Sequence, residues 1–202
     1  HDAMLSESAP VTIADVGDDP TFGAAGDGTG LLWALIDLGA QNAALGVIVD
    51  TAAVADAVHS GVGSELKIDV GGTVDRRAGY PINVTARVRR IADGCVESAD
   101  RCVQNVGRAV LLDVQGRHGG RIDVILTERP PVSVETGLFR ALGVDLTNKK
   151  IIGVKRTTSL RDVPTASGSQ VLVTSTPGIT TPLLHYFNWE HVSRPMHPLD
   201  PT

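Results

Sequence analysis

The stretch VTIADVGDDPTFGAAGDGTGLLWALIDL, residues 11–38, decides the fold of this chain. It opens with a short apolar run, Val11–Val16, which has the length and composition of a buried strand. A glycine-rich segment, 23–30, comes next and leads directly into the apolar run Leu31–Leu38. A buried strand, a glycine-rich bend and an apolar helix form the opening half of a βαβ unit. The stretch therefore predicts an α/β fold.

The residues after this unit repeat the same rhythm. Ala43–Asp50 is almost continuously apolar, as expected for a parallel strand that is buried on both faces. Ala52–His59 follows as a helix, and we expect Thr51 to cap its first turn. Two further apolar strands, Lys150–Lys155 and Gln170–Ser175, continue the parallel sheet near the end of the chain.

The middle of the chain has a different pattern, with apolar and charged residues alternating in steps of two. Asn83–Ile91 alternates most clearly, and Asp93-Gly94 after it is typical of a hairpin turn. We predict one α/β domain over residues 1–202, with a mostly parallel central sheet flanked by helices. An antiparallel β-rich insertion occupies about 65–130, and a proline-rich tail follows at 179–202.

Composition excludes several classes of partner. The net charge is −5 without a basic block, and aromatic residues make up only 3% of the chain, so we expect no nucleic-acid partner. No apolar run reaches the roughly 18 residues that span a bilayer, and no signal-peptide pattern opens the sequence. We therefore expect a cytoplasmic protein without a membrane partner. Cys95 and Cys102 are the only cysteines and have no second pair to complete a zinc site; whether they pair with each other is left open.

Gly26, Asp27, Gly28 and Thr29 form the first candidate site, because they leave backbone N–H groups free at a helix start. Such a cradle suits a substrate carboxylate or another anion. The alternative is that Asp27 or Thr29 caps the helix. The segment has neither the lysine of a P-loop nor a full G-x-G-x-x-G motif, so a nucleotide is not expected.

Charged residues near the ends of the expected strands are the second group of candidates. Lys155 and Arg161 follow a buried strand and can pair with a substrate carboxylate, with an acidic residue of another domain, or locally. Four aspartates also lie at strand ends, where they can either bind a hard cation or cap helices and turns: Asp15, Asp18, Asp19 and Asp50.

Catalysis within the chain has no support from its motifs. No G-x-S-x-G elbow is present, and no two histidines have the helical spacing of a metal site. His185 and His191 flank an aromatic cluster, 186–189, which is a docking surface, a plug in the core or, less simply, a site. We predict no catalytic residue and no metal ligand in this chain.

Several short stretches, taken together and in order, resemble one family. They are AGDGT at 25–29 before LLWAL at 31–35, ALGVIVD at 44–50, VTARV at 84–88, DVILT at 123–127, FRALGVD at 139–145, VK at 154–155, TPG at 176–178 and PLD at 198–200. This ordered set is similar to the C-terminal domain of MlrC-like metallopeptidases, the microcystin-degradation protein family. It covers nearly the whole chain.

The resemblance implies an accessory role. Members of the family carry a larger N-terminal domain, which holds the zinc ligands, so the cofactor is expected there and none is expected in this chain. The implied partners are that N-terminal metallopeptidase domain and a peptide-like substrate, contacted through Gly26, Asp27, Gly28, Thr29, Lys155 and Arg161. The alternative is a stand-alone, non-catalytic binding module. Homo-oligomer formation is left open.

Overall fold

The computed structural model describes residues 1–7, 10–97, 103–131, 135–156 and 170–200. Its central feature is an eight-stranded sheet with the strand order β3-β4-β5-β6-β2-β7-β1-β8. The elements in chain order are α1 Asp2–Leu5, β1 Val11–Asp15, η1 Pro20–Phe22, α2 Gly30–Asp37, β2 Ala43–Val49, α3 Thr51–Ser60, β3 Glu65–Val70, η2 Arg76–Ala78, β4 Ile82–Glu97, β5 Val103–Gln115, η3 Arg117–Gly119, β6 Arg121–Thr127, α4 Glu135–Ala141, η4 Leu146–Asn148, β7 Ile151–Val154, β8 Gln170–Thr174 and η5 Leu184–Tyr186.

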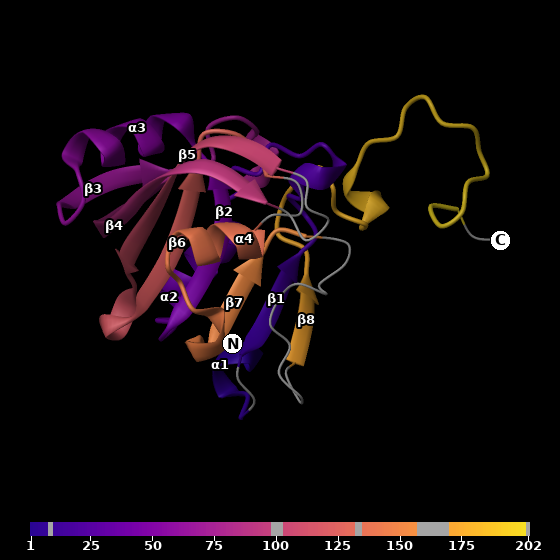
Figure 1. Cartoon of the computed structure of the whole chain (residues 1–202). Helices are drawn as coiled ribbons and strands as arrows, with labels where there is room; N and C mark the ends of the chain where they lie inside the picture. The colour runs from indigo at the N-terminus through magenta and orange to yellow at the C-terminus, as the bar shows by residue number, and fades with distance from the viewer. Residues whose placement is uncertain (8–9, 98–102, 132–134, 157–169, 201–202) are drawn as a thin grey trace.

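The sheet is mixed, as the sequence predicts. β6, β2, β7, β1 and β8 run parallel to one another, and β3, β4, β5 and β6 pair antiparallel. β6 therefore joins the two halves, because it pairs antiparallel with β5 and parallel with β2. The β-rich insertion extends the α/β sheet instead of forming a second one (Figure 1).

Two apolar layers cover the two faces of the sheet. One layer packs α2 and α3 on alternate residues of the strands, with Leu45, Ile48 and Val124 among them. The other packs α4 on the opposite face, where Phe139 lies over β2. A Cβ atom at Gly46 would lie 2.7 Å from the Phe139 ring. Glycine at this position therefore lets the aromatic ring seat directly on the strand.

The cap of α3 differs from the prediction. Asp50, and not Thr51, occupies the N-cap: its backbone is extended, and its Oδ1 accepts a hydrogen bond from the Ala53 N–H at 2.9 Å. Thr51 is already helical, and its hydroxyl donates to the carbonyl of Glu128. The aspartate prevails because its extended backbone aims the carboxylate at the free N–H groups of the first turn.

The turn predicted at Asp93-Gly94 is also wrong. β4 continues through both residues to Glu97, and the strand register shifts between Asp93 and Cys95. A Cβ atom at Gly94 would lie 2.4 Å from the carbonyl oxygen of Gly107 on β5, so glycine permits a close approach of the two strands. An Asp-Gly pair inside a strand pattern marks either a turn or a bulge, and long-range pairing decides between them.

The remaining predictions about local structure have separate outcomes. Cys95 is exposed and free, whereas Cys102 lies outside the described residues. The tail leaves β8, forms η5 and leads away from the sheet (Figure 1). Where the chain is described, none of its helices has the length and apolar character needed to cross a membrane.

Candidate functional site

The carboxyl ends of the parallel strands meet along one edge of the sheet. β1 ends at Asp15, β7 at Val154 and β8 at Thr174 (Figure 1). The residues that follow directly lie together, because Lys155 contacts Asp18 and Thr176 contacts Asp15. Open α/β sheets place their ligands at this edge, because loops diverge from the strand ends. The glycine-rich segment and Lys155 both lie at this edge, so we take it as the candidate site.

The glycine-rich segment binds a carboxylate, and the carboxylate belongs to the chain itself. The N–H of Gly26 donates to Asp18 Oδ1 at 3.1 Å, and the N–H of Gly28 donates to Asp18 Oδ2 at 2.7 Å. A Cβ atom at Gly28 would lie 2.7 Å from that same oxygen, so a larger residue does not fit. The predicted anion cradle therefore exists, and Asp18 occupies it.

Lys155 completes this arrangement from the end of β7. Its Nζ lies 2.8 Å from Asp18 Oδ2 and 2.7 Å from the carbonyl oxygen of Gly26, and the side chain is only 2% exposed. Of the partners left open for Lys155, the structure thus gives a local ion pair. Because a buried lysine is stable only when its charge is matched, the pair with Asp18 fixes the glycine-rich segment against β7.

Asp27 and Thr29 connect residues 74–80 to the glycine-rich segment. Asp27 Oδ2 accepts a hydrogen bond from the Val74 N–H at 2.7 Å, and the Thr29 hydroxyl donates to the carbonyl of Tyr80 at 2.9 Å. Thr29 stands at the N-cap of α2 without making a side-chain cap. Residues 26–29 are all buried beneath this cover. One carboxylate oxygen, Asp27 Oδ1, is buried with no hydrogen-bond partner among the described residues.

The other aspartates at the strand ends accept hydrogen bonds from backbone N–H groups of turns and helix starts. Asp15 accepts hydrogen bonds from the N–H of Gly17 and from both the N–H and the hydroxyl of Thr176. Asp19 caps η1, as Asp50 caps α3. Within the described ranges, no three His, Cys, Asp or Glu side chains come together as a group that could hold a metal ion.

The aromatic cluster near the C-terminus lies at the surface. The ring centroids of His185 and Tyr186 lie 4.5 Å apart with the rings tilted by 38°, and the rings of Phe187 and Trp189 meet edge to face at 5.5 Å. Tyr186 is 70% exposed, so the cluster is not a plug in the core. Arg161, the last predicted contact residue, lies outside the described residues.

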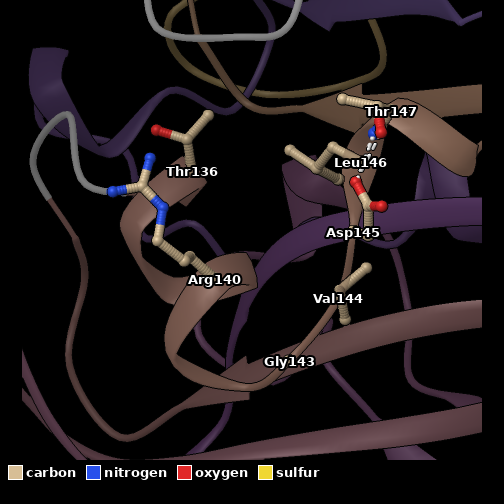
Figure 2. A pocket seen from close by; sticks show the side chains of 7 residues that line it. All are labelled: Thr136, Arg140, Gly143, Val144, Asp145, Leu146 and Thr147. Carbon is tan, nitrogen blue, oxygen red and sulfur yellow. Dashed lines mark hydrogen bonds between the residues drawn. The ribbon is translucent and has the colours of Figure 1, made fainter.

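A separate hollow lies beside α4. It measures about 430 Å³ and is lined by Thr136, Arg140 and residues 143–147 (Figure 2). Figure 2 shows the Asp145 carboxylate turned toward Thr147, whose N–H and hydroxyl both donate to it, while Arg140 points the other way. The Thr147 hydroxyl, and then its N–H, hold the pKa of Asp145 below its ordinary value. This acid caps η4 and is not poised for proton transfer.

Sequence reasoning missed two features of the edge. It considered Asp18 and Lys155 separately, although both follow buried strands that pair with each other, and that adjacency was the signal that could have joined them. It also missed Arg77 on η2, which lines two hollows next to the aromatic cluster. No motif marks Arg77, because the tail reaches it only through the fold.

Fold and edge together define the class: an α/β domain with a mixed sheet, whose carboxyl edge is organised by a buried ion pair. Residues 13–191 match the family model described as MlrC C-terminus, and the chain belongs to this family. It is 28% identical over 200 residues to Microcystinase C from Sphingomonas sp., covering 99% of this chain and 38% of that protein.

A solved structure shares the fold. A crystal structure of a proposed metallopeptidase from Mesorhizobium sp. BNC1 superimposes with a TM-score of 0.80 and 21% sequence identity. The match covers 99% of this chain and 40% of that one. The chain thus spans about two fifths of the length of each of these relatives.

Proposed function

We propose that this chain acts as the C-terminal accessory domain of an MlrC-like zinc metallopeptidase and shapes the substrate cleft. The observation that carries the proposal is its coverage: the match takes in 99% of this chain but 38% of Microcystinase C, and the family model is that of a C-terminus. The partner is the N-terminal metallopeptidase domain, and the substrate is peptide-like.

The donor groups in the described part of the chain do not fit a zinc ion. The described side chains offer no group of three His, Cys, Asp or Glu that could hold a metal ion, so no hydrolytic step is assigned to them. In a metallopeptidase the zinc ion would activate water. We propose that it is bound by the N-terminal metallopeptidase domain.

The proposed contribution of the chain is a rigid wall. Asp18 and Lys155 tie Gly26 and Gly28 to the ends of β1 and β7, and Asp27 and Thr29 tie residues 74–80 to the same segment. These predicted contact residues are buried, so they act by positioning the surface above them. Arg161 remains a predicted contact to the substrate or to the other domain.

A hybrid of Microcystinase C and this chain tests the proposal. The matching C-terminal region of Microcystinase C is either deleted or replaced by this chain, and zinc content and peptide hydrolysis are measured on each protein. We expect the deleted form to keep its zinc and lose hydrolysis, and the hybrid to regain hydrolysis. Loss of zinc on deletion, with zinc restored by this chain, would contradict the proposal.

A stand-alone binding module is the second candidate, favoured by the exposed aromatic cluster. The hybrid separates the two functions. A module that acts alone gives no hydrolysis in the hybrid, yet it still binds its ligand as an isolated chain.

A further inference from the structure

A groove runs between η2 and the C-terminal arm, residues 175–200, at the carboxyl edge of the sheet. Two hollows of about 430 and 490 Å³ share Arg77, Thr181 and Phe187 and therefore adjoin. Ser175, Thr176 and Tyr186 line the first, and Phe22, Leu184 and Trp189 line the second. Both volumes fall in the range of small-molecule and peptide side-chain sites, roughly 300–1,000 Å³. We call this the aromatic groove.

The aromatic side chains of the protein are concentrated here. The whole chain contains only two Trp, two Tyr and three Phe. Four of these seven line the aromatic groove: Phe22, Tyr186, Phe187 and Trp189. Phe22 is 57% exposed and Tyr186 is 70% exposed. Exposed aromatic side chains gathered in one concave place indicate a surface that receives an apolar or aromatic group.

Arg77 supplies the positive charge of the groove; its side chain is 69% exposed and is paired with Asp75. The Asp75 carboxylate accepts hydrogen bonds from Arg77 Nε at 2.9 Å and from Arg77 Nη2 at 2.9 Å. The Nη1 group takes no part in these bonds. Because a guanidinium carries five donors in a rigid fork, the part not bound to Asp75 remains suited to a second carboxylate.

The serine and threonine hydroxyl groups of the groove take part in hydrogen bonds within the fold. The Ser175 hydroxyl donates to Thr181 Oγ1 at 2.7 Å, and that oxygen also accepts from the N–H of Leu183. The Thr176 hydroxyl donates to Asp15 at 2.6 Å. These bonds stiffen the wall, and Arg77 is the charged side chain among the residues that line the two hollows.

We propose that the aromatic groove binds a carboxylate-bearing ligand with one large apolar or aromatic side chain, which packs on Phe187 while Arg77 pairs with the carboxylate. That the ligand is a peptide rests on the proposed function, whereas the pairing of ring and carboxylate rests on the groove alone. Thr176 packs against Gly30, at the start of α2, so the groove borders the glycine-rich segment.

Fluorescence of the chain tests the inference, because Trp189 lines the groove and Trp33 does not. A Trp33→Phe background leaves Trp189 as the sole tryptophan. N-acetyl-L-phenylalanine is the probe, and N-acetyl-L-phenylalaninamide, which lacks the carboxylate, is its control. We expect saturable binding of the acid, with the amide weaker by about tenfold, since a charge-assisted hydrogen bond contributes on this scale.

Two arginine variants of η2 form a matched pair. Arg77→Gln should weaken the acid by about tenfold, whereas Arg76→Gln, next to it in the same turn, should change binding by less than about twofold. Phe187→Ala should weaken the acid and the amide alike. Urea unfolding of each variant verifies that the fold is retained.

Three results would overturn the inference: no saturable response in either fluorescence or amide NMR shifts, equal binding of acid and amide, or equal losses in the two arginine variants. None of these touches the accessory role, which the hybrid protein tests by zinc content and hydrolysis.

Discussion

Replacement of Lys155 by methionine removes the charge that holds the glycine-rich segment. Methionine has nearly the volume and reach of the lysine stem, so the change leaves packing in place and deletes the Nζ group. Asp18 then loses one of three donors and keeps the N–H groups of Gly26 and Gly28. The carbonyl of Gly26 keeps the N–H of Val49 at 3.0 Å.

The magnitude follows from this inventory. Removal of one partner from a buried ion pair costs about 3–5 kcal/mol, because the other charge is left buried and unmatched. Two backbone donors still compensate Asp18, so we expect Lys155→Met to lower the free energy of unfolding by about 3 kcal/mol. Asp18→Asn should cost a similar amount. The double variant should cost about 4 kcal/mol, which leaves a coupling energy of about 2 kcal/mol.

Urea unfolding of the two single variants and the double variant measures these values by linear extrapolation. Lys67→Met on the exposed face of β3 is the matched control, and we expect it to stay within about 0.5 kcal/mol of the parent. The reasoning fails if Lys155→Met costs less than about 1 kcal/mol, as an exposed pair would. It also fails if the effects of the two single variants add within about 0.5 kcal/mol.

Three further changes test other parts of the structure by the same urea assay. Phe139→Ala empties the space over β2 and should cost about 3–5 kcal/mol, whereas Trp33→Ala, at a side chain 58% exposed, should cost far less. Asp50→Ala removes the cap of α3 and should cost about 1–2 kcal/mol, against no more than about 0.5 kcal/mol for Asp56→Ala on the same helix. Hydrogen bonds from the backbone N–H and the guanidinium of Arg108 lower the pKa of Glu128 below its ordinary 4.5. Its stabilising effect is therefore full above that value and is lost as pH falls through the folded pKa, so Glu128→Gln should destabilise at about pH 7 and differ less from the parent as the pH is lowered. A difference that stays constant as the pH is lowered would contradict the last assignment.

Apolar patterning was sufficient to predict the sheet. The run from 43 to 50 predicted a strand buried on both faces, and β2 is buried almost throughout. The alternation from 83 to 91 predicted an antiparallel pair, and β4 pairs with both β3 and β5. Both patterns report which faces meet the core, and burial of those faces is the dominant driving force of folding.

Local signals failed where distant residues decide. Asp93-Gly94 satisfies the local chemistry of a turn, yet the pairing of Asp93 with Arg108 extends the strand past it. Thr51 is a good cap by composition, yet the neighbouring Asp50 also binds the N–H of Gly71, which lies far along the chain. A second partner of this kind cannot be read from a helix start alone.

The free N–H groups of the glycine-rich segment were predicted from the sequence, but their partner Asp18 was not. The glycine-rich segment does present N–H groups to a carboxylate, which is what its composition favours. The carboxylate turned out to be Asp18, because β1 and β7 are neighbours and bring Lys155 beneath the same loop. The role of Arg77 could not be predicted from the sequence, because the hollow that it lines forms only where the C-terminal arm lies against η2.

Zinc titration of the purified chain, with a peptide-hydrolysis assay on the same sample, tests the central claim most directly. We expect no saturable zinc binding and no hydrolysis, because the proposal assigns the zinc ligands to the N-terminal metallopeptidase domain. One tightly bound zinc ion per chain, together with hydrolysis that a chelator abolishes, would contradict the claim and make this chain an enzyme by itself.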